Sequence, residues 1–188
     1  MGRAARWRIS PRAARHPSFD RLEQHTKRAG RARPGGPDGG YKSGVGREAP
    51  TFIASAVDGS EINLKQYRGD WFVVLVFLPT QTASAETALA QLSAAADNLW
   101  GMRGQLLGIC DASRDECTTL AGKVAGLAFP LLPDDGTIAQ AYGALKADGE
   151  VRAMTFIVDR AGKIVWMSEG DVALKPASLM TAFREVAR

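Results

Sequence analysis

The two cysteines, Cys110 and Cys117, are the residues of this 188-residue chain whose side chains are best suited to chemistry. A thiolate is a strong nucleophile, so the two could act as a redox pair. The N-terminal dipole of the helix expected to hold Cys117 favours a thiolate modestly. The carboxylates of Asp111, Asp115 and Glu116 act in the opposite direction, because nearby negative charge raises the pKa of a thiol. The sequence therefore favours the alternative, in which Cys110 is a buried small hydrophobe and Cys117 an ordinary helix residue. Two cysteines also do not make a disulfide scaffold.

Serine and metal chemistry have little support in the part of the chain that looks folded. Both histidines, His16 and His25, lie in the N-terminal segment. A serine such as Ser84 needs a nearby base before it can act as a nucleophile, and that base is commonly a histidine. A metal site built on several histidines lacks its ligands for the same reason. We expect the domain to use no metal and no cofactor.

The cysteines lie on elements that we expect to follow a buried strand, Trp71–Leu78, which is an almost continuous apolar run. A helix over about residues 84–99 has one apolar face. The next strand is expected at Gln105–Cys110, and an S-x-x-E capping box opens a helix over about residues 113–124. A strand, a short helix, a β-hairpin and a last helix should follow, at Phe129–Leu132, Thr137–Tyr142, Met154–Val158 with Lys163–Met167, and Pro176–Val186. This alternation predicts an α/β sandwich with a mixed central β-sheet flanked by helices.

The basic charge of the chain is concentrated in its N-terminal segment. Residues 1–50 hold 12 Arg and Lys against 4 Asp and Glu, whereas residues 51–188 hold 12 against 16. We expect residues 1–44 to be a disordered basic arm, rich in Arg, Gly and Pro, and residues 45–188 to be the folded domain. The arm could bind nucleic acid or another anionic surface, although its composition favours a solvated tail. No apolar run of about 18 residues and no secretory signal is present, so we expect a cytoplasmic protein without a membrane span.

Four segments of the domain are similar to segments of a known family. They are VGREAPTF at Val45–Phe52, LKQYRG at Leu64–Gly69 followed by VVLVF, FPLLPD with AQAYG within Phe129–Gly143, and TFIVDRAGKI at Thr155–Ile164. In this order and spacing they resemble the peroxiredoxins of the alkyl hydroperoxide reductase and thiol-specific antioxidant group, which are redoxin domains of the thioredoxin-fold superfamily. The resemblance spans about residues 45–168. It implies a peroxiredoxin-type, thioredoxin-like fold, and antioxidant oxidoreductase chemistry.

The reactive corner of that family is incomplete in this sequence. Family members carry a peroxidatic cysteine in a P-x-x-x-T-x-x-C pattern, between the central strand and the next helix, where the helix N-terminus stabilises its thiolate. Counted from Pro79, the threonine position is Ala83 and the cysteine position is Glu86. In the register that matches Thr80 and Glu86, the cysteine position is Ala83. The resemblance therefore implies a degenerate active site, meaning a family corner without its cysteine.

The arginine of the family pattern is displaced as well. It would fall on Ala153, and the nearest arginine, Arg152, is one residue earlier. One step along a strand turns a side chain to the opposite face of the sheet. Some family members place a second, resolving cysteine on the helix that here carries Cys117, which gives this residue a slight analogy to the family.

Two functions compatible with the resemblance remain. The favoured one is a non-catalytic binding or accessory role, as a homodimer or with a partner protein. The alternative is weak thiol-dependent hydroperoxide reduction through Cys110 or Cys117.

Overall fold

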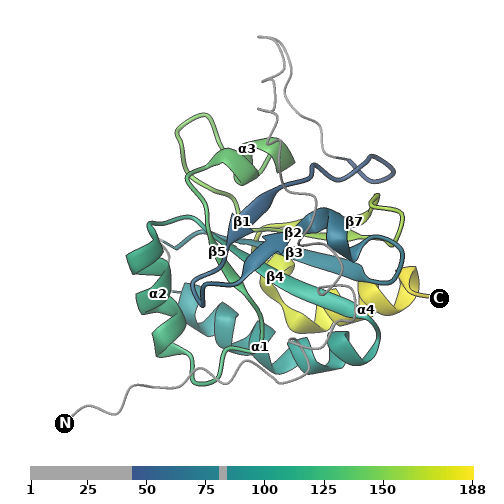
Figure 1. The fold of residues 1–188 in the computed structure, drawn as a ribbon, viewed down its shortest axis with the longest axis horizontal. Helices are drawn as coiled ribbons and strands as arrows, with labels where there is room; N and C mark the ends of the chain where they lie inside the picture. The colour runs from purple at the N-terminus through teal and green to yellow at the C-terminus, as the bar shows by residue number, and fades with distance from the viewer. Residues whose placement is uncertain (1–43, 81–83) are drawn as a thin grey trace, which may run out of the picture. The chain divides into compact units, whose positions relative to one another are not determined.

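The computed structural model describes residues 44–80 and 84–188 of the chain. They belong to a compact unit that spans Tyr41–Arg188 (Figure 1). Residues 1–43 of the expected arm, and Ala83, lie outside the described residues, so the disorder of the arm stays a prediction. Within the described residues, no helix is long and apolar enough to cross a membrane.

A five-stranded mixed sheet forms the centre of the unit, with the strand order β5-β4-β3-β6-β7. Neighbouring strands are parallel from β5 to β3, whereas β6 is antiparallel to both β3 and β7. The predicted mixed sheet is therefore confirmed. The strands are β3 (Phe72–Leu78), β4 (Gly104–Cys110), β5 (Leu131–Pro133), β6 (Met154–Val158) and β7 (Ile164–Glu169).

The middle strand, β3, is buried along its whole length. Its side chains alternate between the two faces, so that Val76 and Leu78 pack on one side, and Leu75 and Phe77 on the other. Burying one such side chain contributes about 1.5–3 kcal/mol. The apolar run in the sequence thus marks the strand that both halves of the core share.

Helices cover one face of the sheet more completely than the other (Figure 1). The first face packs against α1, α2 and α4, and the second against α3 and a two-stranded β1–β2 hairpin. Short 3-10 helices, η2 and η3, connect some of these elements. The bounds are β1 (Ile53–Ser55), β2 (Glu61–Asn63), η2 (Leu64–Tyr67), α1 (Ala85–Gly101), α2 (Arg114–Lys123), α3 (Thr137–Tyr142), η3 (Asp171–Leu174) and α4 (Pro176–Val186).

The predicted strand at Phe129–Leu132 is shifted in the structure, where β5 begins at Leu131. Pro130 has no backbone N–H to give to a sheet. Its carbonyl still accepts a hydrogen bond of 3.0 Å from the N–H of Gly108, and Phe129 is buried in the core under α2. The apolar run is therefore real, but its first two residues approach the sheet without forming a strand.

Candidate functional site

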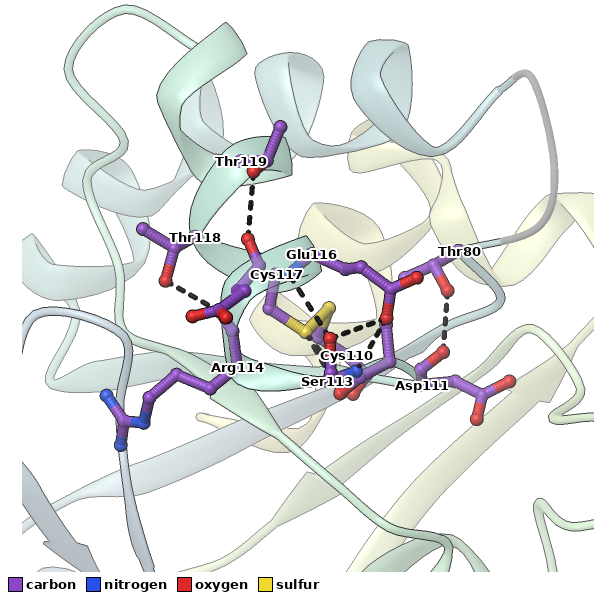
Figure 2. The surroundings of a disulfide bond; sticks show 11 residues. Thr80, Cys110, Asp111, Ser113, Arg114, Glu116, Cys117, Thr118 and Thr119 are labelled. Carbon is purple, nitrogen blue, oxygen red and sulfur yellow. Dashed lines mark hydrogen bonds between the residues drawn. A yellow bond between two sulfur atoms is a disulfide. The ribbon is translucent and has the colours of Figure 1, made fainter.

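The corner that the family pattern singles out follows β3, whose last residue is Leu78. Pro79 and Thr80 come next and are partly buried. The Thr80 hydroxyl donates a hydrogen bond of 2.6 Å to the backbone carbonyl of Asp111, the residue directly after β4 (Figure 2). This bond connects the corner to the end of β4 and occupies the hydroxyl proton of Thr80.

The other side of the corner is the first turn of α1, which contains Glu86. Its exposed carboxylate lies 3.9 Å from the ammonium group of Lys123 on α2. A carboxylate in the first turn is stabilised by the helix dipole, and an exposed ion pair contributes at most about 1 kcal/mol. Glu86 therefore supplies a charge, and no thiol, at the position that the Pro79 register gives to the cysteine.

Arg152 lies two residues before β6 and is partly exposed. Its Nη1 is 3.3 Å from Oε1 of Glu169, the last residue of β7. Its backbone N–H donates to the carbonyl of Ala144. The structure thus gives the guanidinium group a carboxylate partner on the neighbouring strand.

Cys110 and Cys117 form a disulfide bond, with Cα atoms 6.2 Å apart (Figure 2). Cys110 ends β4, and Cys117 lies near the start of α2. Both side chains are fully buried among the apolar residues under the helices. The predicted burial of Cys110 and the place of Cys117 on a helix are confirmed, but Cys117 is not an ordinary helix residue, because it is bonded to Cys110. The turn at residues 111–113 is short enough to return the start of α2 to the end of β4.

A capping box fixes the start of α2, as the sequence predicts. The carboxylate of Glu116 accepts hydrogen bonds from the hydroxyl and the N–H of Ser113, at 2.6 and 3.0 Å, and the Ser113 oxygen accepts from the N–H of Glu116. These bonds from Ser113 hold the pKa of Glu116 below its ordinary value. The next residue is Cys117, so the capping box also positions one half of the disulfide.

Arg114 joins the same turn of α2 to the β1–β2 hairpin. Its guanidinium donates to the backbone carbonyls of Ala56, at 2.9 Å, and Ser55, at 3.1 Å. A groove of about 740 Å³ opens beside it, lined by β1, by Asp111–Arg114 and by the start of α3. The residues between the two cysteines therefore supply one wall of this groove.

Carboxylates give the groove an acidic character, with Arg114 as its basic member. Partial burial raises the pKa of the Asp111 carboxyl group, an N–H from Val151 acts in the opposite direction, and the charges of Asp134 and Glu150 raise it further. Asp134 itself is buried, and its oxygens accept two backbone N–H groups at the start of α3. Asp135 likewise accepts the N–H of Thr137, so both carboxylates have a structural role at the start of that helix.

The sulfur atoms have limited reactivity in this arrangement. A disulfide carries no thiolate, and both sulfurs are shielded from solvent. Within residues 44–80 and 84–188, no group of three or more His, Cys, Asp or Glu side chains could hold a metal ion. What the site can do chemically is thiol–disulfide exchange, once a reductant reaches the bond.

Comparison with known proteins gives one consistent family. The family model described as AhpC/TSA matches residues 45–167. Mouse peroxiredoxin-2 is 34% identical over 142 residues, which cover 68% of this chain and 70% of the mouse protein. A Mycobacterium tuberculosis protein named as a peroxiredoxin is 34% identical over 131 residues, which cover 64% of this chain and 81% of that protein.

Solved structures agree with the sequence comparison. Mycobacterium tuberculosis AhpC superposes with a TM-score of 0.67 at 23% identity, over 76% of this chain and 92% of that chain. This likeness confirms the peroxiredoxin-type, thioredoxin-like fold that the four sequence segments implied. With a family model matched over residues 45–167, the chain belongs to the AhpC/TSA family, the peroxiredoxins.

Proposed function

We propose that this peroxiredoxin-family domain does not reduce peroxides at its strand–helix corner, and acts instead as a binding or accessory module. The state of the sulfur supports this proposal. The sequence from Pro79 to Glu86 contains no cysteine, and both cysteines of the chain are buried in one disulfide. Peroxide reduction by a thiol needs an accessible thiolate, because the thiolate attacks a peroxide oxygen.

A binding role requires a surface that a partner can reach. The groove beside β1 is such a surface, since it is open and combines backbone, carboxylate and guanidinium groups. The partner would be a second copy of the chain or another protein, and it would be recognised by the shape and the charge of the groove.

The disulfide also supports a second function, thiol-dependent hydroperoxide reduction through Cys110 and Cys117. One thiolate would attack a peroxide oxygen, break the O–O bond, and release an alcohol or water. The sulfenic acid formed would condense with the second thiol, release water and leave a disulfide. Two electrons pass from the thiols to the peroxide, and an external dithiol then restores both thiols. The Cys110–Cys117 bond would be the product of such a cycle, but the burial of both sulfurs argues against the cycle.

A peroxide-consumption assay with dithiothreitol as the reductant separates the two functions. The full chain is compared with a Cys110→Ser, Cys117→Ser double variant and with the corresponding double Ala variant, which buries no hydroxyl group. We expect the three proteins to consume peroxide at the same background rate. A wild-type rate about ten times higher than both variants would overturn the non-catalytic proposal, and would assign the activity to the two cysteines.

A further inference from the structure

The disulfide lies where three elements of the domain meet. Four of the residues between its cysteines, Asp111–Arg114, line the groove. Thr80 bonds to the carbonyl of Asp111, which connects this segment to the corner. Arg114 bonds to the backbone just after and at the end of β1. A change in the segment between the cysteines would therefore reach both the groove and the corner.

The surroundings of Cys117 suit a free thiol as well as a disulfide. Its Sγ lies 3.5 Å from the carbonyl oxygen of Ala112 and 3.7 Å from that of Cys110. A disulfide sulfur has no proton, so neither contact is a hydrogen bond while the disulfide is intact. After reduction, the S–H group has two acceptors within range, and a free thiol packs well among apolar side chains. The Cys117 thiol therefore has hydrogen-bond acceptors nearby after reduction, so breaking the bond does not by itself unfold the core.

The bond restrains a short stretch of the folded chain. It joins residues only 7 apart in sequence. The entropy that a cross-link removes from the unfolded chain grows slowly with loop length, so a loop this short gives a smaller global gain than a long one. What the bond restrains is the turn at 111–113 and the start of α2.

We propose that the Cys110–Cys117 disulfide is a redox-sensitive latch on the groove wall. A thiolate of a dithiol reductant attacks one sulfur, the S–S bond breaks, and the second thiol of the reductant resolves the mixed disulfide. The protein gains two electrons and two protons as the Cys110 and Cys117 thiols, and the reductant leaves as its own disulfide. Reduction releases the segment between the cysteines, which loosens the groove wall and its contact with Thr80. This inference holds whichever partner occupies the groove.

Because both sulfurs are buried, exchange with a reductant requires local opening of the start of α2. The exposed residues of that turn, including Arg114, Asp115 and Glu116, lie at the surface, so one helical turn is enough to open. The latch therefore needs no unfolding of the sheet.

Hydrogen exchange followed by mass spectrometry tests the latch on the full chain, oxidised and after reduction by dithiothreitol. The informative amides are those of Asp111, Glu116 and Cys117, which are hydrogen-bonded in the oxidised form. We expect them to exchange at least about ten times faster after reduction, while the amides of Leu106 and Leu107 in the middle of β4 keep their rates. Alkylation and intact mass establish the redox state of each sample.

The control is a Cys110→Ala, Cys117→Ala double variant, whose exchange should be the same with and without dithiothreitol. Equal exchange in oxidised and reduced wild-type protein would overturn the latch. So would reduction that occurs only under conditions where circular dichroism shows global unfolding, since the bond would then be a passive cross-link. If the double variant does not fold, the two redox states of the wild-type chain still decide the question.

Discussion

Burial changes the acid–base chemistry of two tyrosine side chains. Tyr142 is fully buried against the rings of Phe77 and Phe156, at centroid distances of 5.5 and 5.2 Å, and its hydroxyl donates to the carbonyl of Pro50. Burial raises the pKa of Tyr67 to about 12, and it raises the pKa of Tyr142 as well. A phenolate would lose its hydration at either position, so the folded state keeps both hydroxyl protons.

This burial predicts a loss of stability at alkaline pH. Below about pH 10, both residues are protonated in the folded and in the unfolded chain, and their contribution to stability is complete. From about pH 10 to 12, the unfolded chain releases these protons while folded Tyr67 still holds its own, so the free energy of unfolding falls. Each group contributes a slope of at most about 1.4 kcal/mol per pH unit. Urea denaturation at several pH values measures this slope.

Tyr67→Phe should remove the contribution of Tyr67 to that slope, and should leave the free energy of unfolding near neutral pH little changed. Tyr142→Phe should flatten the slope in the same way, but it also loses the hydrogen bond to Pro50, at a cost of about 1 kcal/mol at all pH values. If neither variant reduces the slope of the wild-type protein, the interpretation that both buried tyrosines stay protonated in the folded state is wrong.

Close packing at the level of the elements is clearest where β4 passes under Phe129. Gly108 of β4 has no room for a side chain, because an added Cβ would lie 2.8 Å from Cδ1 of Leu131 and 2.9 Å from Cε2 of Phe129. These side chains belong to the core that also holds the disulfide. The glycine thus lets the residues before and within β5 approach the sheet closely.

Gly108→Ala should therefore destabilise the domain by about 1–3 kcal/mol, the usual cost of overpacking a core. The matched control is Gly122→Ala within α2, where an added Cβ meets nothing within 4 Å. Alanine is the better helix former, so this control should stabilise the domain by roughly 0.5–1 kcal/mol. Denaturant midpoints measure both changes, and shifts of the same sign would contradict this account of the packing.

Elements with a strong local signal could be predicted from sequence. The bounds of α3, β6 and α4 are those predicted: β6 is a short buried run that ends before a turn, and α4 has a proline at its start. The later start of β5 follows from Pro130. The effect of a proline on strand pairing depends on which strand lies beside it, and the sequence does not give that neighbour. The 3-10 helices η2 and η3 were not predicted, since so few residues carry no periodicity.

The site could be predicted less completely than the fold. Sequence placed Thr80 and Glu86 at the strand–helix corner, because the corner follows directly from the apolar strand before it. The bond between Cys110 and Cys117 was missed. The distance between the two cysteines depends on the path of a three-residue turn and on the capping box that positions Cys117. Spacing in the sequence does not give that distance. A cysteine at a strand end, followed at once by a capped helix with a second cysteine near its start, was the signal available.

At the scale of the whole molecule, the peroxiredoxin family model covers residues 45–167, and the described residues begin at 44. Among the described residues, residues 46–48 pair with the start of β7: the N–H of Gly46 donates to the carbonyl of Ile164, and Glu48 forms a bridge with Lys163. These contacts cover part of the outer edge of β7. The edge of the sheet is therefore stabilised in part by residues 46–48.

Deletion of residues 1–44 should therefore leave the thermal denaturation midpoint within about 2 °C of that of the full chain, because the folded domain keeps its contacts. The matched control is deletion of residues 1–49, which removes the pairing with β7 and should lower the midpoint. If the arm binds nucleic acid, the shorter deletion should also abolish a steeply salt-dependent affinity. A large loss of stability on removing 1–44 alone would contradict the proposed domain boundary.

The disulfide also fixes how copies of this protein can be joined. The chain has two cysteines, and they are bonded to each other. While that bond is intact, no sulfur is left to link one copy covalently to another, or to a carrier such as glutathione. On a denaturing gel without reductant, the oxidised protein should migrate as a single chain, and any assembly that it forms in solution must be held by non-covalent contacts.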